Sequence, residues 1–515
     1  MPFSSTPFEI GERLGIRVHP ESFIHQGEAV CLLAESQAGP ELIVLATSDH
    51  PWLERFQGKA DGWEGGFVLK RCPANETNAA ALREALPSLK PALLGLRPSV
   101  GFGDRLGLAT PGHVLALTRT DPGRRLLPIF AQQSRREMVR SNRSPEQVMA
   151  DATWGAFQAG WTGSVGADAD HLKTIEDIDL CALAGFTFFT LDPGGFVDSQ
   201  AEHDDLGVLK DKVRQLSPAD LECSMNDLLH SYTDRKVKAE HLSFILSEPV
   251  VLRAEAKYGK AILHVVRLYR HLLELGRPFE LEISVDETET PTTHAEHYFI
   301  ACELKRLGVE WVSLAPRFVG SFEKGVDYLS PQGIIGDGKA FATDVNGHAA
   351  IARTLGPYKL SLHSGSDKFS IYPLVQEATR GLVHLKTAGT SYLEALRVMA
   401  IFEPVLFREI LRTARQHYDE DRASYHVSAD LSHVPDPDRL GTGKFPELLD
   451  DRTARQVLHV TFGSVLAELG PQLLKALRAH LGPYYETLAG HFGRHLKPFL
   501  KDYSLGSQGR SHDNN

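Results

Sequence analysis

Apolar runs that end in polar residues alternate with amphipathic helical segments between about residues 95 and 430. This alternation favours parallel strands joined by right-handed helical crossovers. Eight such runs are present, and eight parallel strands close a β/α barrel. The sequence therefore predicts an α/β protein with a TIM-type (β/α)8 barrel. The runs are GLRPSVGFGD, WTGSVGADADH, FTFFTLDPG, FELEISVDE, VEWVSLAPR, YKLSLHSGSD, LVHLKTAGTS and SYHVSAD, with PIFAQQS at residues 128–134 as a ninth candidate.

Amphipathic helices are predicted between these runs. Apolar residues recur at helical spacing in AILHVVRLYRHLLELG, and Gly276 followed by Pro278 supplies the stop. Gly308 ends the segment 295–307 in the same way, and Gly356 ends NGHAAIARTLGP. A helix before each following strand is the expected consequence.

The two ends of the chain have a different character from the middle. Three short strand-like runs, EAVCLLAE, ELIVLATSD and GFVLKRC, indicate a small N-terminal α/β cap over residues 1–94. The catalytic barrel is expected over 95–435, and helix-rich sequence indicates a C-terminal helical extension over 436–503. The small, polar segment 504–515 is expected to be a disordered tail.

Charge and cysteine content exclude several classes of protein. A net charge of −11 argues against nucleic-acid and anionic-membrane partners, because both require a basic face. Five cysteines without a CxxC pair indicate neither a zinc knuckle nor a disulfide framework, which favours the cytoplasm. No signal peptide is apparent, and no apolar run approaches the roughly 20 residues that span a bilayer. The expected partner is a small molecule, and the oligomeric state is left open.

Chemically active residues are expected at the carboxyl ends of the barrel strands, where an active site forms in this fold. Imidazoles and carboxylates gathered at one rim suit a divalent cation such as Zn, Mn, Ni, Co or Fe. The residues at these ends are Asp104 and Arg105; Asp168, Asp170, His171 and Lys173; Asp192; Asp286 and Glu287; Arg317; His363, Ser364, Ser366, Asp367 and Lys368; Lys386 and Thr387; and Asp430, with His426 earlier in the same run.

Most of these residues also have a purely structural interpretation. Any single histidine among 23 is more often a surface or core residue than a ligand, although His171 and His363 directly follow strands and have polar neighbours. His426 would lie about four residues deeper than Asp430, so it also fits core packing. Asp286 also suits the N-terminus of a helix. Lys386, the only charge in LVHLKTAGT, would be a Schiff-base nucleophile with a lowered pKa, or an electrostatic catalyst.

Three familiar motifs, two for nucleotides and one for zinc, receive little or no support. The segment GFGDRLG spaces its glycines GxGxxxG, one residue away from the dinucleotide fingerprint, with charged residues in between. No GxxxxGK[ST] or HExxH segment is present, so the sequence offers no phosphate loop and no zincin motif.

Several long segments, in order, resemble the tagaturonate epimerase family, whose members interconvert D-fructuronate and D-tagaturonate in hexuronate catabolism. The resemblance covers roughly residues 95 to 430 and is weaker in the cap and the helical extension. It is carried by GFGDRLGLATPGH, IFAQQS, ATWGAFQAGWTGSVGADADHLKT, SVDETETPTT, EWVSLAPRFVG, YKLSLHSGSDKFSIYP, HLKTAGTSYLEALR and YHVSADL.

The resemblance implies an isomerase that inverts carbon 4 of a 2-keto hexuronate and requires a divalent cation. It implies acid/base roles for Asp170 and Asp286 and metal contacts from His171, His363 and, with less support, His426. Other polar residues of the same rim are expected to contact the substrate. These are Asp104, Arg105, Gln133, Lys173, Asp192, Arg317, Ser364 and Lys368.

The chemistry of carbon 4 limits the mechanism. Its hydrogen is not acidic, because carbon 4 is not adjacent to the carbonyl of a 2-ketose. Two routes remain, either transient oxidation by a nicotinamide or retro-aldol cleavage between carbons 3 and 4, and the latter fits a cation and two carboxylates. The alternatives are a Schiff-base aldolase or ketose epimerase that uses Lys386, and a non-catalytic sugar-acid sensor.

Overall fold

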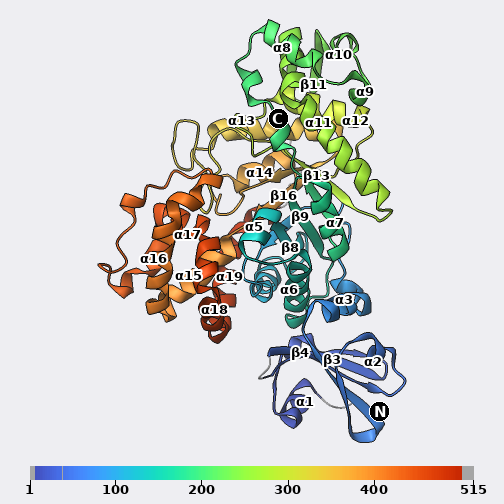
Figure 1. Ribbon diagram of the computed structural model, residues 1–515, viewed down its shortest axis with the longest axis vertical. Coiled ribbons are helices and arrows are strands. Elements are labelled where there is room, and N and C mark those ends of the chain that lie inside the picture. Colours follow the sequence, from blue (N-terminus) through green and yellow to red (C-terminus); the bar gives the residue numbers. More distant parts are fainter. Residues whose placement is uncertain (1–5, 37–38, 502–515) are drawn as a thin grey trace, which may run out of the picture.

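Eight parallel strands close into a barrel in the structure, a computed structural model that describes residues 6–36 and 39–501 (Figure 1). The strand order around the barrel is β10-β13-β14-β15-β16-β7-β8-β9. The predicted α/β barrel is therefore confirmed. The strands are β7 (Ser99–Gly103), β8 (Leu127–Ser134), β9 (Gly166–Leu172), β10 (Phe188–Leu191), β13 (Glu280–Ser284), β14 (Ser313–Ala315), β15 (Lys359–Leu362) and β16 (Val383–Thr387).

One of the eight predicted strands is wrong. PIFAQQS, the ninth candidate, forms most of β8, whereas the residues of SYHVSAD are not in a strand. SYHVSAD does not form a strand because the barrel is already closed without it. The edge of β7 is already occupied by β16, since His384 pairs with Ser99 and Thr387 with Phe102, so no edge remains for a further strand.

Helices cover the outside of the barrel, as the apolar spacing predicts. The segment that ends at Gly276 is the last part of a 27-residue helix, and both Gly276 and Gly308 adopt the left-handed backbone that stops a helix. These helices are α4 (Thr110–Thr120), α5 (Arg135–Arg140), α6 (Pro145–Gln158), α7 (Ile175–Ala184), α11 (Glu248–Glu274), α12 (His294–Arg306), α13 (Lys339–Leu355), α14 (Tyr372–Thr379) and α15 (Thr390–Phe402).

A separate antiparallel sheet precedes the barrel and lies at the bottom of Figure 1. Leu94 packs against Leu127 and Ile129, and the backbone N–H of Leu94 donates a 2.9 Å hydrogen bond to Glu280. Leu127 and Glu280 begin their strands, so this domain joins the barrel at the end opposite the strand C-termini. Its elements are α1 (Pro7–Leu14), β1 (Arg17–Val18), β2 (Ile24–Gln26), β3 (Ala29–Ser36), β4 (Gly39–Thr47), α2 (Pro51–Arg55), β5 (Lys59–Gly62), β6 (Phe67–Pro73) and α3 (Glu76–Ala85).

Two further groups of elements surround the barrel. An insertion between β10 and β13 lies at the top of Figure 1. The C-terminal helices lie to the left of the barrel in this view, and α19 packs against α4 and α15. The insertion contains α8 (Leu206–Arg214), α9 (Pro218–Leu221), α10 (Met225–Tyr232), β11 (Arg235–Ala239) and β12 (Leu242–Leu246). The C-terminal helices are α16 (Pro404–Asp421), α17 (Arg452–Val460), α18 (Phe462–Ala479) and α19 (Leu481–Leu496).

The boundaries expected for the N-terminal cap, the barrel, the C-terminal extension and the tail stay a prediction. The tail, residues 504–515, lies outside the described residues. No single described helix is long and apolar enough to cross a membrane. Only α17 and α18 taken together reach the necessary length and composition, across a 75° bend.

The barrel interior is unusually polar, and this determines where the site forms. Charged or polar side chains at alternating positions of β9, β13, β15 and β16 are buried inside it. Lys359 donates a 3.1 Å hydrogen bond to Ser99 near one end, and Lys386 contacts carboxylates near the other. Burying charge is costly unless it is paired, so the polar interior indicates a functional centre.

Candidate active site

Two histidines from different strands face each other at the C-terminal mouth of the barrel. His171 is the second-to-last residue of β9 and His363 directly follows β15, and their ring centroids lie 4.9 Å apart. His171 has a φ of 54° and Ser364 has a φ of 48°, so both sites use the left-handed backbone that L-residues rarely adopt. Such conformations concentrate where function requires a particular side-chain direction.

Each imidazole is held by a buried carboxylate on one nitrogen and faces another carboxylate with the other. His171 Nδ1 lies 3.1 Å from Asp192, and its Nε2 lies 3.9 Å from Asp170. His363 Nε2 lies 2.7 Å from Glu282. Its Nδ1 lies 3.1 Å from Asp286. This arrangement is typical of metal-ligating histidines, whose second nitrogen is oriented by an outer carboxylate.

The carboxylates create a strong demand for positive charge. Burial lowers the pKa of His171, but Asp170, Glu287 and Asp192 outweigh burial and raise it to about 10. Burial likewise lowers the pKa of His363, and the neighbouring carboxylates raise it to about 9. Protons on the imidazoles, or a divalent cation, satisfy this demand. Ligand atoms of Asp170, His171 and His363 lie within 4.8 Å of one another, so this donor set fits a cation.

Lys386 lies in a cage of three carboxylates beneath the histidines. Its Nζ is 2.8 Å from Asp168, 2.7 Å from Asp170 and 2.8 Å from Glu282. Burial lowers the pKa of Lys386, but the three carboxylates outweigh burial and hold it well above its ordinary value. The Schiff-base interpretation requires a lowered pKa for Lys386. That prediction is wrong, because the three carboxylates hold the amine as an ammonium ion.

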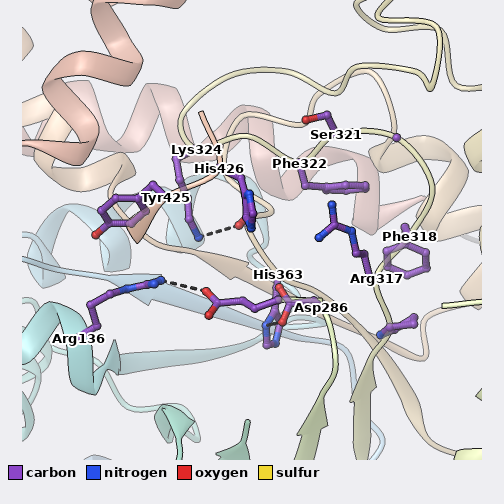
Figure 2. Close-up of a pocket in the computed structure, with 14 residues that line it drawn as sticks. Arg136, Asp286, Arg317, Phe318, Ser321, Phe322, Lys324, His363, Tyr425 and His426 are labelled. Atoms are coloured by element: carbon purple, nitrogen blue, oxygen red, sulfur yellow. Dashed lines mark hydrogen bonds and ion pairs between the residues drawn. The ribbon is translucent and has the colours of Figure 1, made fainter. Parts of the chain in front are cut away.

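A pocket opens above this cluster, and Figure 2 shows Arg317 beside Phe322 and near Asp286. Among the described residues, the Arg317 guanidinium makes no hydrogen bond or ion pair, which leaves it available to an anion. The lining residues are Arg136, Asp286, Glu287, Pro316, Arg317, Phe318, Gly320, Ser321, Phe322, Lys324, His363, Ser364, Tyr425 and His426.

Three residues predicted to contact the substrate lie away from the pocket. Asp104 accepts backbone hydrogen bonds that shape the loop after β7, from Leu106 at 3.0 Å among others. Gln133 accepts a 3.1 Å hydrogen bond from Arg143. Lys368 is fully buried, and its Nζ donates to three backbone carbonyls at 2.6 to 3.1 Å.

Four other predicted residues occupy supporting or peripheral positions. Arg105 borders the cavity beside Lys386, but it is committed to Glu137 at 2.6 Å. Asp192 and Lys173 pair at 3.2 Å behind His171. His426 borders the pocket on a non-strand segment, and the clusters of described residues close enough to share a cation do not include it.

The sequence also left several residues of the site unassigned. Gln132, rather than Gln133, reaches the cluster, donating a 3.2 Å hydrogen bond to Asp170. Arg136 pairs with Glu287 at 3.0 Å, and Lys324 donates a 2.7 Å hydrogen bond to Ser364 (Figure 2). Arg136 lies two residues after the end of β8, so its position near a strand end was a usable signal. Lys324 lies in the long connection after β14, where no sequence signal was present.

Comparisons with known proteins agree with this geometry. The family profile described as "UxaE: tagaturonate epimerase" matches residues 19–499. The tagaturonate/fructuronate epimerase of Thermotoga maritima is 43% identical over 486 residues, which cover 94% of this chain and 96% of the relative. Two glycerol-complexed crystal structures of the fructuronate-tagaturonate epimerase UxaE from Cohnella laeviribosi have TM-scores of 0.86 and 0.87, at 33% and 32% identity. Each comparison covers 96% of this chain and 99% of the other.

The profile match spans nearly the whole chain, and the agreement in sequence extends to the N-terminal sheet and the C-terminal helices. The chain therefore belongs to the tagaturonate epimerase family.

Proposed function

We propose that this protein interconverts D-fructuronate and D-tagaturonate by inverting carbon 4, with a divalent cation bound at the barrel mouth. The relatives carry this activity in their names. The observation that carries the proposal is the meeting of Asp170, His171, His363 and Asp286 at one mouth, beside a pocket whose Arg317 guanidinium is unpaired within the described part of the chain.

Retro-aldol cleavage is the route that these side chains suit. A base removes the proton of the carbon-4 hydroxyl, and the bond between carbons 3 and 4 breaks. Its electron pair passes to carbons 2 and 3 as an enediolate, and carbon 4 becomes an aldehyde. The aldehyde turns, carbon 3 attacks its other face, and the new carbon-4 oxygen recovers the proton. No atoms are gained or lost, so the product is the epimer.

The residues of the chain take separate roles in this scheme. Asp286 is the proposed base, because it borders the pocket and is ionised. Burial raises its pKa, but the His363 and His171 imidazoles outweigh burial and hold it below its ordinary range. Asp170, His171 and His363 would hold the cation, whose identity among Zn, Mn, Ni, Co and Fe is open. When bound, the cation supplies Lewis-acid stabilisation of negative charge at the carbon-2 oxygen.

Arg317 is the proposed anchor for the carboxylate at carbon 6. A guanidinium matches a carboxylate with two parallel hydrogen bonds. Held in this way, the aldehyde fragment stays in the site while carbon 4 turns. Lys386 fixes Asp170 and places a permanent positive charge beneath the reacting carbons.

Two alternatives receive less support from the geometry. A Schiff base requires a neutral amine, whereas the cage around Lys386 holds a proton on it. A sugar-acid sensor would bind the ligand without turnover.

The direct test is to incubate purified protein, loaded with Mn, Zn, Ni or Co, with fructuronate and to separate the products. Tagaturonate of unchanged mass is the expected product. Binding of fructuronate without any tagaturonate, under every metal, would favour the sensor and contradict the proposal.

Removal of the cation gives a further prediction. Treatment with a chelator, followed by dialysis, should abolish activity, and addition of one of the four cations should restore it. A chelated protein that keeps full activity and contains no metal by elemental analysis would refute the cation requirement. In that case, trapping by borohydride in the presence of substrate tests Lys386 instead.

Replacement of the proposed carboxylate anchor gives a third prediction. Arg317→Ala should raise KM by ~10- to 100-fold, because a hydrogen bond between charged groups contributes about 1.5–3 kcal/mol. Lys368→Met is the matched control. Lys368 is another cation predicted to contact the substrate, but among the described residues its Nζ donates only to backbone carbonyls. Its loss should lower the melting temperature and leave KM nearly unchanged; the opposite pattern would move the anchor to Lys368.

A further inference from the structure

A second cluster of metal-ligating side chains lies outside the barrel mouth, on helices α12 and α13. Figure 1 labels both helices. It contains His294, the first residue of α12, and Asp344 and His348, one turn apart on α13. Asp344 Oδ1 lies 3.4 Å from His348 Nε2 and 3.7 Å from His294 Nε2. Tetrahedral zinc with ligands at about 2.0–2.2 Å separates its ligand atoms by roughly 3.3–3.6 Å. We propose that this cluster is a second, structural zinc site.

An unpartnered nitrogen points into the cluster. His348 is fully buried, and among the described residues its Nε2 has no hydrogen-bond partner. A buried polar atom without a partner is costly, and an unfilled ligand position is one physical explanation of it. A zinc ion bound to this nitrogen removes the cost.

The other nitrogen of the same ring is oriented by a hydrogen-bond chain. His348 Nδ1 lies 2.8 Å from His297 Nδ1, and His297 Nε2 lies 2.8 Å from the Tyr358 hydroxyl. When His348 donates from Nδ1, its Nε2 carries the lone pair that binds a cation. Such outer partners are the usual support of metal-ligating histidines.

The surface of α13 leaves room for the third ligand. Gly347 lies against the His294 ring, and a Cβ at this position would overlap His294 Nε2. Glycine within a helix costs about 1 kcal/mol relative to alanine, so its presence here has a packing reason. The space permits the imidazole to lie against α13, where its Nε2 donates a 2.9 Å hydrogen bond to the backbone carbonyl of Asp344. Zinc binding at His294 Nε2 would replace this hydrogen bond.

A cation at this site would fix the segment that carries Arg317. Asp344 Oδ2 accepts a 3.0 Å hydrogen bond from Val319 N, two residues after Arg317. The backbone of Thr292, two residues before His294, donates a 2.8 Å hydrogen bond to Arg317 O. Zinc would therefore join α12, α13 and the rim of the pocket into one rigid unit without touching the substrate.

Metal counting tests the proposal independently of the epimerase activity. Protein stripped with a chelator is dialysed against excess zinc, passed over a desalting column and analysed for zinc and protein. We expect two zinc ions per chain in the wild type and one in His294→Ala, which changes a partly exposed residue at a helix start. His171→Ala should also retain one, and the double variant none. His433→Ala, at an exposed histidine, is the matched control and should retain two.

Each remaining outcome separates the two sites. A His294→Ala variant that binds as much zinc as the wild type overturns the second site. A His171→Ala variant that binds two ions overturns only the assignment at the barrel mouth. Gly347→Ala keeps all three ligands but displaces His294, so it should also lose one zinc ion. Finally, zinc should raise the melting temperature of His171→Ala but not of the double variant, and equal shifts would contradict the structural role.

Discussion

Replacing Lys386 with methionine is expected to lower the free energy of unfolding by about 3–5 kcal/mol and kcat by ~10²–10³-fold. The substitution leaves Asp168, Asp170 and Glu282 buried and facing one another without the ammonium that now lies 2.7–2.8 Å from each. One or more of them must then take up a proton or move, which also disturbs the position of Asp170. Denaturant titration and steady-state kinetics measure the two effects.

The barrel interior supplies its own control for this substitution. Lys359 is also buried in the barrel, but it bonds Ser99 rather than a carboxylate, and burial lowers its pKa to about 8. Lys359→Met removes a charge that the interior stabilises poorly, so stability should be little changed or increased. If both substitutions cost the same, the loss at Lys386 reflects lysine packing and the importance of the carboxylate cage is disproved.

Asp286→Asn should lower kcat by ~10²–10⁴-fold with a much smaller change in KM, which is the usual contribution of a general base. The amide keeps the shape of the side chain and its contact with Ser284, but it cannot accept the proton of the carbon-4 hydroxyl. Initial rates of tagaturonate formation, measured at several fructuronate concentrations, separate kcat from KM. The melting temperature of the variant shows whether the fold is retained.

Glu287 is the neighbouring carboxylate and the matched control. It pairs with Arg136 at 3.0 Å, so Glu287→Gln should weaken one side of the pocket and affect kcat much less than the change at Asp286. The reverse ranking of the two variants would transfer the proposed base to Glu287.

The barrel was predictable because its signal is repeated, whereas the choice among nine candidate runs was not. SYHVSAD alternates like a strand, but alternation describes only one chain and pairing requires a free partner edge. That edge is taken when β16 pairs with β7. PIFAQQS lacks alternation because every residue of β8 is buried, on both faces of the strand.

The site was predictable where a residue's position at a strand end was sufficient, as at His171, Asp286 and His363. The prediction failed where a shift of one residue in the strand register decided which side chain points into the barrel. The pairing of β8 shifts between Ile129 and Ala131, so parity along the strand changes and Gln132 points inward. No local pattern in IFAQQS reports such a shift.

Residues in irregular loops are the second part of the site that the sequence did not predict. Lys324 reaches Ser364 from a connection without regular structure. The neighbouring residue Glu323 forms a 2.9 Å ion pair with Arg452 of α17. Arg452 is distant from Glu323 in the sequence. Such long-range contacts leave no periodic trace.

The closure of β16 against β7 also sets an order of events during synthesis. Lys386 and Asp170 lie 216 residues apart, so the acidic strands leave the ribosome long before the lysine that neutralises them. A nascent chain that stops before residue 383 would carry mutually repelling acids and an open sheet edge. Barrel closure must therefore be a late step, and folding should be slow because it depends on contacts between distant parts of the chain.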